Sequence, residues 1–458
     1  MSNVSSAGVV GPWYKELTPY HWFVFVVAAL GWLFDTMDQQ LFVLARDEAV
    51  ADLMKLAPTD PAVAKFGGSA TMWFLFGWAM GGLGFGIMGD RVGRVKTMLA
   101  TILLYSIFTG LSVFARNYNE FVIYRFLTGL GVGGEFAVGV ALIAEVMPDR
   151  ARPYALSWLQ ALSAIGNCTA ALIYIVLGHL QSAGHLANLT LPGGTPFTAW
   201  RIAFSIGTLP ALLAIVIRRK LKEPERWAAV GEKHQKKGSY AEMFGNPVLR
   251  KNAFIGLAIG FAGVVGLWGI GFFSVQLQKS VFRKSFMAEG MSGDMLEGQI
   301  KLWSGYTSLM LNVGAFAGMI LSGIVAQRLG RRSAFAIAFT LGMLSTASVF
   351  MFFDSRDDVF WLIPIMGMCL LSIFGCLAIY FPELFPTRLR STGTSFCYNV
   401  GRFAAAVGPF TFGMLTSTVF KGEAEPMRYA GVTMCSIFLL GLAVLPFAPE
   451  TKGKPLPE

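Results

Sequence analysis

Twelve apolar stretches run through this 458-residue sequence, and they constrain its fold more than any other feature. A helix needs roughly 20 mostly apolar residues to cross the hydrocarbon core of a bilayer, and each stretch is close to that length. The longest polar interruption, residues 219–251, divides the stretches into six and six. The stretches are residues 20–44, 66–88, 97–115, 120–144, 155–178, 200–218, 252–277, 302–325, 334–353, 359–381, 393–418 and 429–448.

The overall composition excludes a water-soluble globule. Apolar residues make up 54% of the chain and charged residues 14%, whereas soluble proteins carry about 25% charged residues. The formal net charge of +10 lies in short segments between apolar stretches, which indicates membrane orientation rather than nucleic-acid binding. We therefore predict an all-α integral membrane protein with twelve transmembrane helices in two six-helix halves.

Lysine and arginine are not shared evenly between the two sets of loops. The loops on the side of both termini carry the clear majority of them, and such loops face the cytoplasm. The first stretch is too long for a signal-peptide core of roughly 7–15 residues, so we expect it to stay in the chain. We expect a multi-pass protein of the cell (plasma or inner) membrane with both termini cytoplasmic. Its predicted parts are a cytoplasmic N-terminal segment (1–19), a first half (20–218), a cytoplasmic central loop (219–251), a second half (252–448) and a cytoplasmic tail (449–458).

Two motifs recur in the two halves at nearly the same spacing. Residues 89–96 (GDRVGRVK) follow the second stretch, and residues 326–333 (AQRLGRRS) follow the eighth. Residues 145–152 (EVMPDRAR) follow the fourth stretch, and residues 383–390 (ELFPTRLR) follow the tenth. The chain is thus predicted to be an internal duplication, an arrangement typical of transporters with a binding site between the repeats.

These motifs resemble those of the major facilitator superfamily. Residues 89–96 are similar to its G-x-x-x-D/E-R-x-G-R-R/K signature, and residues 222–227 (KEPERW) match in part the PESPRW segment of sugar-porter-like members. Residues 125–135 (RFLTGLGVGGE) and 399–402 (NVGR) resemble the sialate and lactate branch of the metabolite:proton symporters. Residues 163–170 lack the GPxxGG motif of antiporters in the superfamily, which disfavours efflux.

The resemblance implies a transporter that works as a monomer by alternating access, without a cofactor. We expect proton-coupled uptake of a small organic anion, such as a monocarboxylate or sugar acid. A sugar porter or an efflux antiporter of drugs or metabolites is the alternative within transport. A membrane enzyme would need a catalytic constellation, and the sequence offers no metal cluster or nucleophile motif. A transporter-like sensor is not separable by sequence from a carrier.

Charged residues inside membrane spans are costly and point to function. Four of them are candidates for proton coupling: Asp35, Asp38, Arg125 and Glu135. Asp35 lies about 14 Å and Arg125 about 8 Å from the outer side of the membrane at 1.5 Å per residue, so Arg125 can pair with Asp35 or Asp38. Asp35 and Arg125 also match the first-helix aspartate and fourth-helix arginine of proton-coupled sugar porters. The alternatives are a permanent structural ion pair and, for Glu135, a buried hydrogen-bonded acid.

A second set of residues is predicted to bind the substrate. Arg402 lies about 14 Å into the eleventh stretch, near the midplane, where a guanidinium can bind a carboxylate through two parallel hydrogen bonds. Tyr398 and Asn399 lie beside it, and Gln39 shares a helix face with Asp35. Alternatively, Arg402 is the partner of a membrane acid.

A third set is predicted to form a cytoplasmic latch between the halves. In the family, residues such as Asp90, Arg91 and Arg94 hold the halves together in the outward-open state, and Glu145 or the start of the eleventh helix would supply the opposite charge or helix end. Glu383 and Arg388 are assigned to the same gate from the repeated motif. The alternative is that these charges only set orientation.

Glycine and the metal-binding residue types have simpler interpretations. Gly129, Gly131, Gly133 and Gly134 are predicted to allow close helix packing, because no strand precedes them as a dinucleotide-binding turn requires. Residues 408–409 (GP) are expected to kink the eleventh helix. Neither the four histidines nor the five cysteines show a metal-binding spacing, so no metal is expected.

Overall fold

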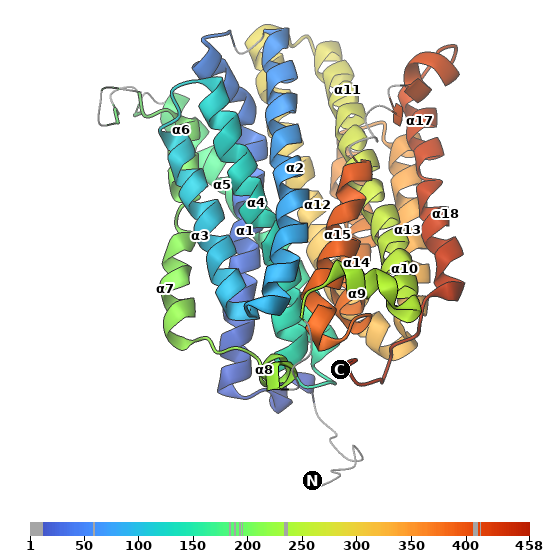
Figure 1. Ribbon diagram of the computed structural model, residues 1–458. Coiled ribbons are helices and arrows are strands. Elements are labelled where there is room, and N and C mark those ends of the chain that lie inside the picture. Colours follow the sequence, from blue (N-terminus) through green and yellow to red (C-terminus); the bar gives the residue numbers. More distant parts are fainter. Residues whose placement is uncertain are drawn as a thin grey trace.

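The protein is a bundle of long helices that run roughly parallel to one another (Figure 1). This architecture comes from a computed structural model. The structure describes residues 12–57, 60–182, 185–186, 189–191, 194, 196–232, 237–405, 411–412 and 414–458.

The first half has six crossings, and the sixth is broken into two helices. The break at residues 207–209 follows from Gly207, where an added side chain would meet Asp38 of the first crossing, and from Pro210, which starts the second piece. The helices are α1 (Pro19–Met54), α2 (Pro61–Arg91), α3 (Arg94–Val113), α4 (Tyr118–Val146), α5 (Arg152–Ser182), α6 (Ala199–Ile206) and α7 (Pro210–Lys220), with α8 (Glu225–Glu232) and α9 (Tyr240–Gly245) in the central loop.

The second half repeats this plan. Its helices are α10 (Pro247–Val264), α11 (Phe272–Ala288), α12 (Gly293–Leu329), α13 (Arg331–Phe352), α14 (Leu362–Glu383), α15 (Arg390–Ala405), α17 (Pro426–Met434) and α18 (Ile437–Val444). Two π-helical segments, η2 (Val265–Gly271) and η5 (Leu415–Val419), accompany them. Short 3₁₀ turns complete the described chain: η1 (Trp13–Glu16), η3 (Asp357–Phe360), η4 (Thr387–Leu389) and η6 (Leu445–Phe447).

The predicted all-α fold is confirmed, with corrections to the bounds of individual spans: the first helix, predicted at 20–44, continues to Met54, and the eighth, predicted at 302–325, begins at Gly293. Among the described residues, ten helices are long and apolar enough to cross a membrane, and residues 199–214, which include α6 and the start of α7, form a shorter apolar segment. The predicted seventh span, 252–277, is too short, because α10, η2 and α11 continue from Pro247 to Ala288. The eleventh span, predicted at 393–418, begins earlier, at Arg390. The predicted kink at 408–409 lies outside the described residues.

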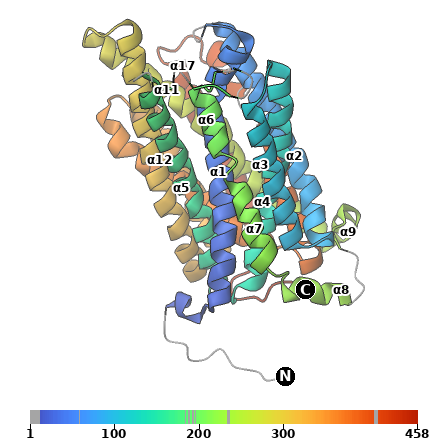
Figure 2. The same cartoon turned by 90° about the vertical axis from the view of Figure 1, so that its left-hand side faces the viewer.

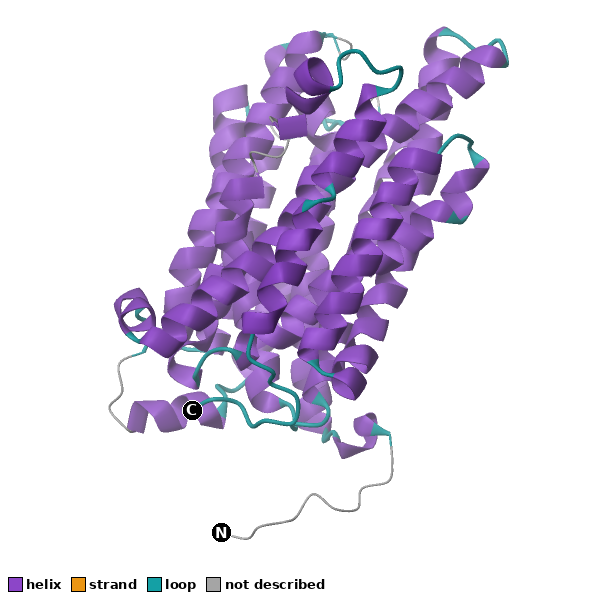
Figure 3. Cartoon of the chain, turned by 90° about the vertical axis from the view of Figure 1, so that its right-hand side faces the viewer, coloured by secondary structure: helices purple, strands orange, loops and turns teal. Residues whose placement is uncertain are grey.

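Both described ends of the chain lie at one end of the bundle, together with α8 and α9 (Figures 1 and 2). We call this the termini end and the opposite side the far end. The view in Figure 3 shows the same arrangement from the other side, with helices throughout and loops confined mainly to the two ends. An even number of crossings accounts for this placement.

Glycines bring α2 and α4 into close contact. A side chain on Gly81 would clash with the backbone carbonyl of Leu130, and one on Gly133 would clash with the carbonyl of Trp78. Gly129 meets the same helix at Phe74. The packing interpretation of the glycine-rich segment is therefore confirmed.

The third helix of each half is capped at the termini end by a carboxylate that follows the last crossing. Glu223 accepts hydrogen bonds from the backbone N–H groups of Arg94, Val95 and Lys96 at the start of α3. Glu450 accepts from the N–H groups of Arg331 and Arg332 at the start of α13. Burial raises the pKa of the Glu450 carboxyl, but four donating backbone N–H groups outweigh it and leave the pKa below its ordinary value.

The same helices are capped at the far end by an arginine from the start of the last crossing. Arg201 donates to the carbonyls of Val113 and Ala115, just at the end of α3. Arg428 donates to the carbonyls of Phe350 and Met351, at the end of α13. A negative charge at a helix N-terminus and a positive charge at its C-terminus both interact favourably with the helix dipole. The helices α3 and α13 are therefore stabilised at both ends.

Two exposed glycines at opposite ends of the bundle test the orientation. Neither Gly245 at the termini end nor Gly422 at the far end has a neighbouring atom that a side chain would meet. Because the loops of the termini end carry most of the lysine and arginine, we expect a Gly422→Cys protein to react with an impermeant thiol reagent in whole cells and a Gly245→Cys protein to stay unlabelled.

The measurement should use a background with Cys168→Ser, since the other four native cysteines are buried. Permeabilised cells provide the control, in which both variants should label. Labelling of Gly245→Cys in intact cells would reverse the assigned orientation.

Candidate functional site

Arg402 lies at the interface between the halves, in the middle of the bundle. Its side chain comes from α15 and is 7% exposed. The guanidinium carbon lies 3.8 Å from the ring centre of Trp78 on α2 and 4.7 Å from that of Tyr398 on its own helix. Cation–π contacts of this kind attract a cation to the face of an aromatic ring. Arg402 is therefore held by aromatic groups from both halves.

Tyr398 extends this aromatic layer into the first half. Its ring stacks on Phe136 of α4 with centroids 4.0 Å apart, and Phe374 of α14 packs edge-on against it. Asn399 donates from its amide to Ser395, one turn earlier, and is fully buried against Gly82. Gln39 is half-buried on α1, and among the described residues it forms no hydrogen bond with Tyr398 or Asn399.

Asp35 shares the central region with Arg402. It is 1% exposed, and it interacts electrostatically with Arg402, Glu135 and Asp38. Within the described part of the chain, neither of its carboxylate oxygens has a hydrogen-bond partner. Asp35 is thus a buried acid that interacts with a positive charge from the second half.

Asp38, rather than Asp35, lies beside Arg125. The guanidinium and the Asp38 carboxylate are 4.0 Å apart, and both side chains are fully buried. Arg125 also donates to the Ser112 hydroxyl at 2.7 Å and to the Phe108 carbonyl at 3.4 Å. Rings of Phe42, Phe121 and Phe204 surround it. The sequence left Arg125 two possible partners, and the geometry selects Asp38.

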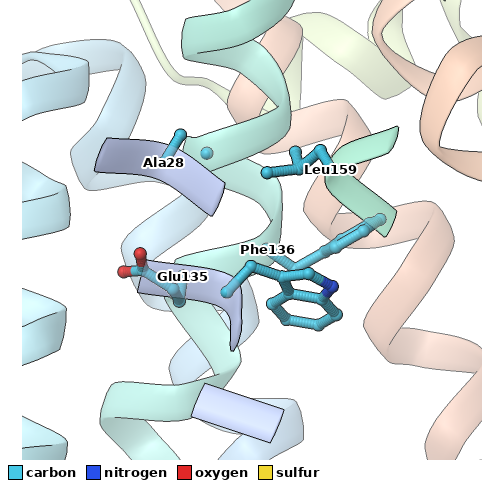
Figure 4. A pocket seen from close by; sticks show the side chains of 6 residues that line it. Ala28, Glu135, Phe136 and Leu159 are labelled. Atoms are coloured by element: carbon cyan, nitrogen blue, oxygen red, sulfur yellow. The ribbon is translucent and has the colours of Figure 1, made fainter. Parts of the chain in front are cut away.

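Glu135 lines a narrow cavity between α1, α4 and α5 that has no room for a water molecule. One carboxylate oxygen accepts a hydrogen bond from Thr101 at 2.6 Å. The other approaches Gly31 so closely that a side chain there would clash with it. Figure 4 shows Glu135 and Phe136 pointing to different sides of α4, with Ala28 and Leu159 across the cavity.

Asp90 joins the two halves at the termini end. Its carboxylate accepts hydrogen bonds from the backbone N–H groups of Ser391 and Thr392, at 3.1 and 2.8 Å, and from the Thr392 hydroxyl at 2.6 Å. These groups begin α15, so the carboxylate also faces the positive end of a helix dipole. Arg94 donates to the same carboxylate at 2.6 Å.

Glu145 receives an arginine from each half. Arg94 donates to both of its oxygens, at 2.7 and 3.3 Å, and Arg390 of the second half donates at 2.8 Å. Arg94 also donates to the carbonyl of Thr387 across the interface. All these charged side chains are buried. Arg390 was missed as a site residue, although the repeated motif aligns it with Arg152 and could have indicated it.

The remaining predicted gate residues contact other groups. Arg91 donates to the carbonyls of Lys237 and Gly238 in the central loop. Arg388 pairs with Glu242 of α9 at 2.8 Å.

Glu383 pairs within its own half. Arg331 donates to both of its oxygens, at 2.7 and 3.0 Å, and the Thr451 hydroxyl donates as well. Among the described residues, the hydrogen bonds that join the halves directly therefore centre on Asp90, Arg94 and Glu145. The halves are also joined by the Ser395 hydroxyl, which donates to the Gly82 carbonyl, by the Thr392 hydroxyl, which donates to the Gly86 carbonyl at 3.4 Å, and by Asn167 of α5, which donates to Asn312 of α12 at 3.1 Å.

Comparison with known proteins identifies the family to which this chain belongs. The model of the Major Facilitator Superfamily matches residues 24–409, so the chain belongs to that superfamily and is a membrane transporter rather than an enzyme. The solved proton:xylose symporter XylE shares the fold, with a TM-score of 0.72 at 20% identity over 95% of this chain and 98% of the other.

Curated relatives match between 79% and 96% of the chain. A putative metabolite transport protein of Haemophilus influenzae is 27% identical over 96% of this chain and 99% of its own length. A probable 4-methylmuconolactone transporter of Cupriavidus pinatubonensis is 28% identical, covering 96% and 93%. The cis,cis-muconate transport protein of Acinetobacter baylyi is 28% identical, covering 79% and 81%.

Removing the charge of Asp90 tests the latch. Asp90→Asn replaces the charged acceptor at the start of α15 with a neutral one, and hydrogen bonds to a charged acceptor are roughly twice as strong as neutral ones. The termini end should then open more often. A Ser395→Cys probe, buried between α2 and α15, should react with a thiol reagent at least several-fold faster in purified Asp90→Asn protein.

The matched control is Glu225→Gln, which removes an exposed acid at the same end of the bundle. It should leave the labelling rate of the probe unchanged. Equal rates in Asp90→Asn and the unaltered protein would reduce Asp90 to an orientation charge.

Proposed function

We propose that this transporter takes up a small organic anion together with a proton. The observation that carries the proposal is the placement of Arg402 against aromatic rings of both halves, next to the buried acid Asp35. A cation between two moving halves can bind a negatively charged substrate, and an acid beside it can bind the coupled proton.

The chemistry of the central layer favours a carboxylate. A guanidinium offers a planar, bidentate donor set that matches a carboxylate. Trp78, Tyr398 and Phe136 supply flat apolar surfaces beside it, which suit an unsaturated or aromatic acid. Relatives named for 4-methylmuconolactone and cis,cis-muconate transport support this class. A neutral sugar would leave the charge of Arg402 unused, so a sugar porter is the weaker alternative.

Asp35 is the proposed proton carrier. When ionised, it competes with a substrate carboxylate for the positive charge of Arg402; when protonated, it leaves that charge to the substrate. Binding of a proton and a monovalent anion then moves no net charge into the site. We assign Asp38 of α1 and Arg125 of α4 to a supporting ion pair. Glu135 is proposed as a further buried acid that takes part in proton transfer.

Alternating access uses the contacts between the halves. The Asp90, Arg94 and Glu145 cluster holds the termini end together in the conformation described. We propose that this end faces the cytoplasm of a cell whose plasma or inner membrane holds the protein, and that the transporter acts as a monomer. Substrate then enters from the far end, and release requires Arg390 to separate from Glu145 and the start of α15 to separate from Asp90.

Arg402 is expected to make the protein distinguish charged substrates from neutral ones. Losing one partner of a charged hydrogen-bonded pair typically costs about 2–5 kcal/mol in binding, so Arg402→Ala should weaken affinity for the acid by roughly 30-fold or more. Arg402→Lys should remain impaired, because it keeps the charge but loses the planar fork. Binding of cis,cis-muconate or benzoate against the corresponding amide, measured by calorimetry or thermal shift, checks this.

The unaltered protein should prefer the acid over its amide, and Arg402→Ala should lose most of that preference. Equal binding of acid and amide by the unaltered protein, or full discrimination by Arg402→Ala, would make Arg402 a structural residue and remove the main support for an anionic substrate.

The proposed coupling role of Asp35 predicts that its substitution affects uphill uptake and exchange differently. Asp35→Asn cannot change its charge, so uptake driven by a pH gradient into proteoliposomes should be abolished. Exchange of labelled for unlabelled substrate should continue at least partly, because it needs no net proton movement. Asp38→Asn is the comparison, since it should destabilise the protein by leaving Arg125 unpaired. Undiminished concentrative uptake by Asp35→Asn would exclude Asp35 as the carrier.

A further inference from the structure

The second half contains a hollow at the termini end, remote from Arg402. Its volume is about 580 Å³, and residues from three helices line it. Val248, Lys251 and Asn252 come from the first turns of α10, Arg332 from the first turn of α13, and Phe447 from η6, just after α18. Helix α18 packs against both α10 and α13, and these helices lie together on the right of Figure 1.

The hollow lies at the level where three apolar spans end. The spans that contain α10 and α13 begin at Pro247 and Arg331, and the span that contains α18 ends at Phe447. Because each of these residues marks a boundary between apolar helix and polar loop, the hollow opens at the interface between hydrocarbon and water. A ligand in the hollow would contact the lipid headgroups on its polar side and the lipid acyl chains on its apolar side.

Two cations give the hollow a positive charge. Lys251 is exposed. Arg332 uses its Nε to donate to the Ala448 carbonyl at 2.5 Å, and within the described chain its two terminal nitrogens donate to no protein acceptor. The carboxylate of Glu450 accepts hydrogen bonds from the backbone N–H groups that begin α13. The lining residues themselves include no acid.

Apolar side chains flank these cations. Val248 is 66% exposed and Phe447 is 65% exposed, beside Lys251 and Arg332 in the lining of the same hollow. A free inorganic anion would use the cations but not the apolar surface. A phospholipid uses both, because its phosphate can bind the cations while its chains cover the apolar groups.

We propose that this hollow binds the headgroup of an anionic phospholipid from the leaflet at the termini end. The lipid phosphate bridges Lys251 on α10 and Arg332 on α13, and Asn252 lies within the same lining as a polar contact. All these residues belong to the second half, so the lipid stabilises that half rather than either access state. The proposal rests on the membrane fold and not on the identity of the transported substrate.

The test compares lipids on the purified full-length protein. Phosphatidylglycerol and phosphatidylcholine of the same chain length are titrated in detergent, and bound lipid is counted by native mass spectrometry. A cation near the membrane surface contributes about 1 kcal/mol to anionic lipid binding, so Lys251→Gln/Arg332→Gln should weaken phosphatidylglycerol binding by roughly 30-fold. The unaltered protein should prefer phosphatidylglycerol to phosphatidylcholine.

Lys96→Gln/Lys222→Gln is the matched control, because it removes two exposed cations at the same end of the first half. This double variant should bind phosphatidylglycerol as the unaltered protein does. Lys251→Glu alone alters only an exposed side chain. We expect this variant to bind phosphatidylglycerol more weakly at an unchanged melting temperature, which would show that the loss of binding is not caused by misfolding.

Three outcomes would overturn the proposal. They are equal binding of the two lipids, an equal loss in the Lys96→Gln/Lys222→Gln control, and full displacement of the lipid by millimolar inorganic phosphate or glycerol phosphate. The last outcome would identify a site for free anions in place of a lipid site. A failure here leaves the transport proposal intact, since uptake and acid binding are measured separately.

Discussion

A charge inside a bilayer cannot be solvated by water, and the fold of this transporter is organised around that constraint. Arg125 is enclosed by Asp38, a serine hydroxyl and three phenylalanine rings, and Arg402 is enclosed by aromatic rings near Asp35. At the termini end, Glu145 takes an arginine from each half. Since a buried charge without a partner is strongly destabilising, a movement of the halves must provide new partners for the charges whose contacts cross between them, such as Glu145 with Arg390 and Arg402 with Trp78. Pairing therefore both stabilises the protein and controls its motion.

The two halves are alike in their internal supports and unlike in their contacts with each other. Arg94 with Glu145 and Arg331 with Glu383 are equivalent pairs in the repeat. The first half adds Asp90, which binds the start of α15, whereas the repeated motif has the neutral Gln327 at that position. A neutral amide accepts hydrogen bonds from a helix N-terminus more weakly than a carboxylate does. The interface at the termini end is thus asymmetric: the first half provides the carboxylates and the second half provides a helix N-terminus and Arg390.

Apolar periodicity and the repeated motifs were enough to predict the twelve crossings, the duplication and the closeness of Asp90, Arg94 and Glu145. They were not enough to choose between Asp35 and Asp38 as the partner of Arg125, because both lie on one face of α1 and the choice depends on side-chain packing. The π-helical turn after α10 was also missed, since an extra residue in a helical turn leaves no mark in an apolar stretch. Glu223 and Glu450 were not recognised as caps, because each acts on a helix far away in the sequence.

The capping of α3 and α13 at both ends has a consequence for the order in which the protein is made. Each of these helices is bounded by residues that the ribosome adds much later: Arg201 and Glu223 for α3, and Arg428 and Glu450 for α13. Until those residues leave the ribosome, the N–H and C=O groups at the ends of the third helix of each half lack these side-chain partners. Both capping residues of α3, Arg201 and Glu223, precede the second half in the sequence, so the ends of α3 can be capped before the second half is made.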